Sequence, residues 1–159
     1  MSIQVGQTLP DVEIRAIGDT IEQTHTGTLF AGRKVVMFAV PGAFTPTCSN
    51  RHLPGYVQHF GEFQARGIDV MCLAVNDAYV MQAWAVSQNV PHGLLMLADG
   101  NGAFTRSIGL ELDGNAYGMG LRSRRFGLFA DDGVVKLLQV EAPGEFRVST
   151  AEAMLEAIG

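Results

Sequence analysis

Apolar runs alternate along this chain with segments whose apolar residues recur at helical spacing. Lys34–Val40 (KVVMFAV) and residues 68–75 (IDVMCLAV) are almost wholly apolar and rich in β-branched residues, which predicts strands buried on both faces of a parallel sheet. The segment between them has the helical period, so we expect a helix over residues 47–66. Because proline lacks the amide hydrogen of the helical ladder, we expect a bend at Pro54.

The alternation of strands and helices continues beyond residue 75. Asn76 and Asp77 are suited to cap a helix. Residues 94–98 (LLMLA) predict a third strand. The glycine-rich residues 99–102 predict a turn, which leads into a short helix over residues 103–108.

The last third of the chain combines a loop, a hairpin and a helix. Residues 109–120 are rich in glycine and show no period, so we expect a long loop of the kind that often carries function. Residues 125–130 and 134–140 flank the sequence DDG, which predicts a β-hairpin. Residues 149–152 (STAE) match a capping box, which predicts a final helix.

A parallel core, a terminal antiparallel hairpin and helices on both faces predict a thioredoxin-like fold. This is a three-layer α/β/α arrangement around a mixed sheet, in a single domain over residues 1–159. A flavodoxin-like sheet is the alternative on pattern alone. Residues 41–48 (PGAFTPTC) disfavour it, because one glycine and two prolines make a poor phosphate-binding loop.

Composition and charge narrow the classes of function. The chain has 159 residues, of which 47% are hydrophobic and 17% charged, as in globular proteins. Its net charge of −5 gives no electrostatic basis for binding nucleic acid or an anionic membrane surface. The N-terminal segment has no signal pattern and the chain has no long apolar run, so we expect a cytoplasmic location.

Only two cysteines are present, Cys48 and Cys72, too few for a disulfide scaffold and without the CxxC pairing of zinc sites or dithiol enzymes. Cys48 follows a predicted strand and opens a predicted helix, where free amide groups and a partial positive charge favour a thiolate. The Thr45 hydroxyl, three residues earlier, is expected to reach the same point. No cluster of residues implies a metal or an organic cofactor.

Other residues near Cys48 have ordinary structural interpretations beside functional ones. A second positive charge is available from a cluster in LRSRRF, comprising Arg122, Arg124 and Arg125, although such a cluster is often a solvated strand edge. Cysteine and threonine at a helix start are often caps or core residues. Arg51 is expected to be exposed, and His52 is either a proton carrier or a hydrogen-bonded structural residue.

The segment PGAFTPTCSNRHLPG carries a family resemblance. Its pattern Pro41-x-x-x-Thr45-x-x-Cys48 resembles the active-site motif of peroxiredoxins, in the AhpC/TSA-redoxin superfamily, and the wider segment is similar to the type II (peroxiredoxin-5-like) group. Four further blocks extend the likeness over most of the chain, namely VNDAYVMQAW, LADGNGAFT, RSRRFGLFADDGVVK and GEFRVSTAEAML. The resemblance implies an antioxidant peroxidase that reduces hydrogen peroxide and organic hydroperoxides.

The resemblance also implies roles for site residues. Cys48 would be the peroxidatic cysteine, which forms a sulfenic acid. Thr45 and Arg125 would bind peroxide, and Pro41 would shield the pocket. Arg125 is chosen over Arg124, because it directly precedes Phe126 as the family's arginine precedes its phenylalanine.

Two further residues are expected to lie around the peroxide-binding residues. His52 falls in the matching HLPG block and is expected to lie behind the residues that touch peroxide. Phe44, together with the loop over residues 114–120, offers an apolar wall for organic hydroperoxides. Neither residue is expected to react.

The chain lacks the resolving cysteine that some members of the family carry, and this bears on which thiol reduces the oxidised Cys48. Cys72 is expected to be buried in a strand, and GEFRVST has Ser149 but no cysteine, where some members carry a resolving cysteine. The likeness is closest to members that use glutathione and glutaredoxin, so we expect a one-cysteine cycle that an external thiol completes, with thioredoxin as the alternative reductant. The family resemblance also implies a homodimer. A non-enzymatic peroxide sensor on the same fold is the other alternative. A dithiol oxidoreductase is disfavoured, because Arg51 stands where CxxC needs cysteine.

Overall fold

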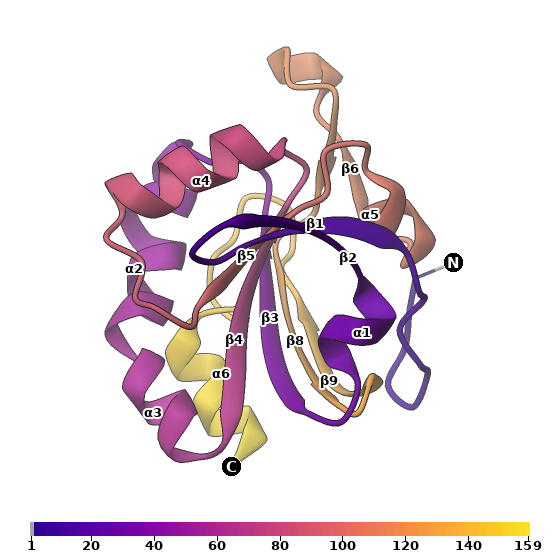
Figure 1. Ribbon diagram of the computed structural model, residues 1–159. Helices are drawn as coiled ribbons and strands as arrows, with labels where there is room; N and C mark the ends of the chain where they lie inside the picture. Colours follow the sequence, from indigo (N-terminus) through magenta and orange to yellow (C-terminus); the bar gives the residue numbers. More distant parts are fainter. Residues whose placement is uncertain (1) are drawn as a thin grey trace.

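A seven-stranded mixed sheet lies at the centre of the molecule (Figure 1), seen in a computed structural model that describes residues 2–159. In spatial order the strands are β2 (Ile21–His25), β1 (Glu13–Ile17), β5 (Leu95–Ala98), β4 (Ile68–Ala74), β3 (Lys34–Val40), β8 (Phe126–Asp131) and β9 (Val134–Val140). The middle strands β5, β4 and β3 are parallel, and both edges pair antiparallel. This confirms the predicted parallel core and hairpin.

The two-sided apolar runs of the sequence form the strands buried on both faces. Residues 35–40 of β3 have no exposed surface. Phe38 lies opposite Cys72 of β4, which in turn lies opposite Met96 of β5, and all three belong to one core. Neighbouring residues such as Met37 and Leu73 belong to a second core, because side chains alternate between the faces of a strand.

Helices cover both faces of the sheet and complete three layers (Figure 1). One core contains residues of the four helices α2 (Leu53–Gln58), α3 (Phe60–Ala65), α4 (Ala78–Ser87) and α6 (Ala151–Ile158). The other contains residues of α1 (Thr26–Phe30) and α5 (Ala103–Ser107). This layering confirms the predicted thioredoxin-like fold class.

The predicted continuous helix over residues 47–66 is wrong in detail. Its first turn is the π-helical turn η1 (Cys48–His52), in which the Leu53 amide donates to the carbonyl of Cys48 five residues earlier. Pro54 lies in the first turn of α2, where a missing amide hydrogen costs little. The helix instead breaks at His59, whose φ of −96° and ψ of 8° separate α2 from α3.

The predicted loop over residues 109–120 contains regular structure. It forms β6 (Glu111–Asp113), the 3-10 turn η2 (Asn115–Tyr117) and the approach to β7 (Leu121–Ser123), which pairs antiparallel with β6. These strands are only three residues long, and every residue of β6 is exposed, so no hydrophobic period marks them. The sequence pattern also predicted no element before residue 34, where β1, β2 and α1 lie.

Two turn and cap predictions have different outcomes. The β8–β9 hairpin is confirmed, with Asp132 and Gly133 at positive φ of 50° and 77°, as a two-residue turn of this kind requires. The predicted cap of α6 is one residue off, because the Thr150 side chain accepts from the Ala153 amide and Ser149 has another partner. No helix within residues 2–159 is long and apolar enough to cross a bilayer.

Candidate active site

Cys48 is the first residue of η1, directly beyond β3 and a loop, and its side chain has no exposed surface. The loop is closed by short contacts. The Thr45 amide and hydroxyl both donate to the Gly42 carbonyl, at 3.4 and 2.6 Å, and the Ala43 amide donates to Oδ1 of Asn76 at 2.9 Å. These hydrogen bonds hold the loop between β3 and η1 in a defined shape, so that Cys48 lies at the start of η1.

The other predicted loop residues are exposed to different degrees. Thr45 has its hydroxyl proton committed to Gly42, so its oxygen is left to accept. Pro41 is half-buried, and its shielding of the site stays a prediction. Phe44 is 55% exposed and has a positive φ of 63°, an unusual conformation for a side chain of this size.

Arg125 is the residue that contacts the sulfur. Its Nη2 lies 3.1 Å from Sγ of Cys48, and its Nη1 lies 2.8 Å from Nδ1 of His52. The neighbouring arginines face elsewhere: Arg122 donates to the carbonyls of Met119 and Val75, and Arg124 donates to the carbonyl of Glu141. Of the three arginines in the cluster, the structure brings Arg125 to Cys48.

His52 is a buried, neutral imidazole. Arginine can only donate, so Nδ1 must accept, and the ring proton therefore lies on Nε2, 3.0 Å from the Ser149 carbonyl. Burial, followed by the positive charge of Arg125, lowers the pKa of His52 to about 3, against the opposing effect of the Ser149 carbonyl. His52 thus holds Arg125 and does not titrate near neutral pH, which favours the structural interpretation over the proton carrier.

Cys72 lies in β4 with no exposed surface, between β3 and β5. Burial raises the pKa of its thiol well above the ordinary value, the negative charge of Cys48 acts in the same direction, and Arg125 opposes both. A thiol in these surroundings stays protonated and is a poor nucleophile. The predicted burial of Cys72 is confirmed.

Sequence reasoning missed the side chains that close the site from the C-terminal segment. The Phe146 ring lies under both Arg51 and Arg125, with its centre 4.8 and 5.8 Å from their guanidinium carbons. Ser149 supplies the carbonyl for His52, and Glu141 binds Ser149. No local pattern marks these residues, because they reach the site only through folding.

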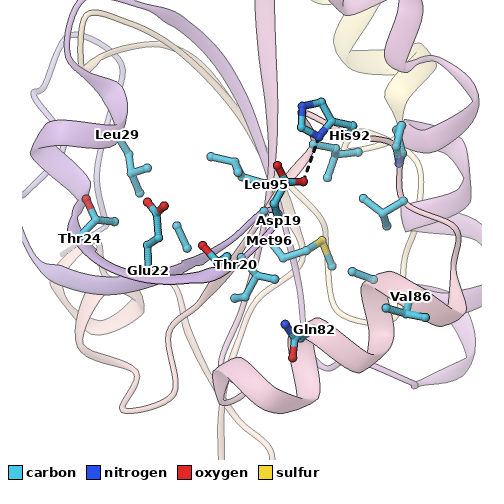
Figure 2. A pocket seen from close by; sticks show the side chains of 18 of the residues that line it. Asp19, Thr20, Glu22, Thr24, Leu29, Gln82, Val86, His92, Leu95 and Met96 are labelled. Atoms are coloured by element: carbon cyan, nitrogen blue, oxygen red, sulfur yellow. Dashed lines mark hydrogen bonds and ion pairs between the residues drawn. The ribbon is translucent and has the colours of Figure 1, made fainter.

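A pocket of about 760 Å³ lies elsewhere, between the β1–β2 hairpin, α4 and the segment that leads into β5. Figure 2 shows its side chains, including the ion pair between Asp19 and His92 at 3.1 Å. Neither cysteine lines it. Within residues 2–159 no group of three histidine, cysteine or acidic side chains is placed to hold a metal ion.

The geometry around Cys48 suits nucleophilic sulfur chemistry. A guanidinium group at 3.1 Å stabilises negative charge on sulfur. It also provides a fixed donor beside the place where an attacked atom would sit. Because the site is buried, these interactions are stronger than they would be in water.

Comparisons with known proteins agree with this chemistry. The model of the Redoxin family matches residues 4–155. The chain is 48% identical to peroxiredoxin-2E, chloroplastic, of Arabidopsis thaliana over 99% of its own length and 70% of the relative, and 45% identical to peroxiredoxin-2C of Oryza sativa subsp. japonica over 98% of each. Its fold matches a crystal structure of reduced Prx3 from Vibrio vulnificus in complex with H2O2, with a TM-score of 0.91 and 49% identity over 98% of this chain and 99% of the other. The chain therefore belongs to the Redoxin family and, within it, to the peroxiredoxins.

Proposed function

We propose that this peroxiredoxin, a thiol-dependent peroxidase, reduces hydrogen peroxide and organic hydroperoxides with Cys48 as its peroxidatic cysteine. The observation that carries the proposal is the 3.1 Å contact between Arg125 Nη2 and Cys48 Sγ in a buried site. The assignment of the chain to the type II (peroxiredoxin-5-like) group is part of the proposal. It is supported by the motif that contains Pro41, Thr45 and Cys48.

The first step is an in-line displacement on the peroxide. The Cys48 thiolate attacks one oxygen, an S–O bond forms, the O–O bond breaks, and the other oxygen leaves as water or alcohol after taking a proton. The sulfur is oxidised to sulfenic acid and the peroxide is reduced. Arg125 and the Thr45 oxygen hold the peroxide, Pro41 limits access of water, and Phe44 provides an apolar side for organic peroxides.

We propose that an external thiol, glutathione, reduces the sulfenic acid. Glutathione attacks the sulfur, an S–S bond forms and water leaves. A glutaredoxin thiolate then attacks the glutathione sulfur, an S–S bond forms between these two, and the bond to Cys48 breaks and releases its thiolate. A second glutathione reduces the glutaredoxin disulfide and leaves as oxidised glutathione. Two observations support an external thiol: Cys72 is buried with a raised pKa, and Ser149 occupies the segment where some relatives carry a resolving cysteine. No organic cofactor or metal enters this cycle.

The test is steady-state peroxide consumption with purified protein and a screen of reductants. Glutathione with glutaredoxin is expected to sustain many turnovers, with thioredoxin as the alternative. Cys48→Ser is expected to abolish turnover, and Cys72→Ser is expected to retain most of it. Equal losses in the two variants would reject the one-cysteine cycle. A single oxidation without turnover, under every reductant, would favour a peroxide sensor.

A homodimer is also part of the proposal. Phe44, Tyr79 and Tyr117 are 55%, 78% and 83% exposed, which is unusual for side chains of this size. They lie in segments that approach one another, because Ala43 binds Asn76, and Met119 and Arg122 lie next to Gly42. A cytoplasmic location stays a prediction from the sequence.

A further inference from the structure

Glu141 follows β9 and is buried. Within residues 2–159, the hydrogen-bond donors to its carboxylate are main-chain amides and one hydroxyl. It accepts from Ser149 Oγ at 2.7 Å, from the Ser149 amide at 2.8 Å, and from the amides of Arg147 and Val148 at 2.9 Å. Burial disfavours the charge, but these hydrogen bonds outweigh burial, so the pKa of Glu141 lies below its ordinary value. An ionised carboxylate therefore fixes the shape of residues 147–149.

Residues 147–149 end at Ser149, whose carbonyl binds His52 in the active site. The Ser149 carbonyl accepts from Nε2 of His52 at 3.0 Å and from the Tyr56 hydroxyl at 2.7 Å. The main chain of Glu141 is tied to the same site, because its amide donates to the Arg125 carbonyl at 2.9 Å. One residue thus joins the backbone of the arginine to the segment that orients its histidine partner.

We infer that Glu141 is a positioning residue for the Arg125–Cys48 contact, acting through the Ser149 carbonyl and His52. The carbonyl holds the proton of His52 on Nε2, which leaves the Nδ1 lone pair facing Arg125. Arg125 is then held at Nη1, and Nη2 is directed at the sulfur. If residues 147–149 shift, His52 loses its hydrogen bond to the Ser149 carbonyl. The imidazole then no longer orients the Arg125 guanidinium toward Cys48.

The surrounding charges support this role over a simple ion pair. The cationic side chain of Arg147 pairs weakly with Glu145 at 3.8 Å, and Arg147 donates to the Glu141 carboxylate through its amide. The Arg124 guanidinium reaches the main-chain carbonyl of Glu141, at 3.4 Å. Every donor to the carboxylate that the structure describes belongs to residues 147–149. The charge of Glu141 is therefore directed at the segment that carries the Ser149 carbonyl.

The test compares Glu141→Gln with Glu145→Gln, which makes the same chemical change in the same segment at a half-exposed side chain. The readout is the rate constant for oxidation of Cys48 by hydrogen peroxide. It is followed through Trp84, whose Nε1 donates to Ser49 next to the cysteine. Glu141→Gln is expected to lower this rate constant by about 10- to 100-fold, since small misplacements of a catalytic group have effects of this order. Glu145→Gln is expected to leave it unchanged.

A second readout separates positioning from a loss of fold. The Nε2 proton of His52, observed by 15N-edited NMR and assigned by its absence in His52→Asn, is expected to exchange slowly in the wild type and fast in Glu141→Gln. In the His52→Asn background, Glu141→Gln is expected to change the rate by less than about twofold, because both changes break the same connection. Additive losses, or a rate loss with an unaltered His52 signal, would overturn the inference.

Glu141→Asp covers the case in which Glu141→Gln does not fold. It keeps the charge and shortens the reach, so a severalfold slower oxidation and a weakened His52 signal are expected, and an unchanged rate and signal would overturn the inference. The inference rests on the proposed peroxidase function. A wild-type Cys48 that peroxide does not oxidise would reject that function, whereas the His52 signal tests the inference independently.

Discussion

Arg125 uses its two terminal nitrogens for two different partners. Nη2 reaches the Cys48 sulfur and Nη1 reaches His52, at 3.1 and 2.8 Å. The planar guanidinium fixes the angle between these two bonds, so holding one nitrogen directs the other. A lysine has a single nitrogen on a flexible stem and cannot make both contacts in the same geometry.

Arg125→Lys is therefore expected to lower the rate constant for Cys48 oxidation by about 10- to 100-fold. This is less than the roughly 100- to 1000-fold effect of losing a fixed donor outright, because lysine keeps the positive charge. Stopped-flow measurement with hydrogen peroxide tests this. Arg124→Lys is the matched control, because the Arg124 guanidinium donates to the Glu141 carbonyl, at 3.4 Å, and not to Cys48 or His52. This variant is expected to keep nearly the wild-type rate. Equal losses in both variants would contradict the assignment of Arg125.

At the scale of elements, the break between α2 and α3 is tied to α6 by a histidine. His59 donates from Nδ1 to Glu62 at 2.7 Å and from Nε2 to Glu152 of α6 at 2.8 Å. The hydrogen bond to Glu62 raises the pKa of His59 above 6.5, burial opposes this, and the charge of Glu152 adds to it. Protonated His59 thus links two helices on the face of the sheet that carries Cys48.

This link predicts a pH dependence of stability. A raised pKa in the folded state means that the stabilisation is fully present below the unfolded value of 6.5 and is lost as pH rises through the higher folded pKa. Replacing His59 with Gln is expected to lower the free energy of unfolding by up to about 1 kcal/mol below that value, and by less at alkaline pH. Urea unfolding at about pH 5.5 and about pH 9 measures the difference.

His92→Gln serves as the control for this effect. His92 pairs with Asp19 at 3.1 Å, but both side chains are at least 80% exposed. Pairs of this kind contribute little to stability. A pH-dependent change of the same size in both variants would show that the His59 link has no special effect.

The packing of α6 on β8 requires a glycine. A Cβ added at Gly127 of β8 would lie 2.8 Å from Sδ of Met154, whose side chain is fully buried. Gly127→Ala is expected to destabilise the protein by about 1–3 kcal/mol through overpacking. In α3, Gly61 has open space around it, so Gly61→Ala is expected to stabilise the protein by about 0.5–1 kcal/mol. Thermal unfolding compares the two, and equal shifts would contradict the packing argument.

At the scale of the whole molecule, the exposed aromatic side chains of Phe44, Tyr79 and Tyr117 near the active-site loop favour a homodimer. The wild type is expected to sediment as a dimer of the 17.1 kDa chain. Tyr79→Glu is expected to shift it to monomer, because a buried, unpaired carboxylate in an interface is strongly unfavourable. Val5→Glu alters a residue that is also exposed, at 60%, but lies in the N-terminal segment, and it is expected to stay dimeric. Sedimentation equilibrium decides, and a wild-type monomer at micromolar concentration would reject the dimer.

The sequence by itself predicted the elements whose signals are local. Two-sided apolar runs marked β3 and β4, and the DDG turn marked the β8–β9 hairpin, because burial on both faces and turn geometry depend on neighbouring residues. The position of Cys48 at the strand end followed from the same patterns. Short exposed strands such as β6 carry no such signal and were missed.

The family resemblance named Arg125 as the arginine of the site, but only the tertiary structure decided how side chains far apart in the sequence meet at the sulfur. Arg125 lies 77 positions from Cys48, and Ser149 lies 97 positions from His52. Their contacts depend on how β8 and the segment before α6 pack against η1, and no periodicity records this. The same packing makes His52 neutral and gives Glu141 its four donors, since both burial and hydrogen-bond partners are properties of the folded chain and not of the local sequence.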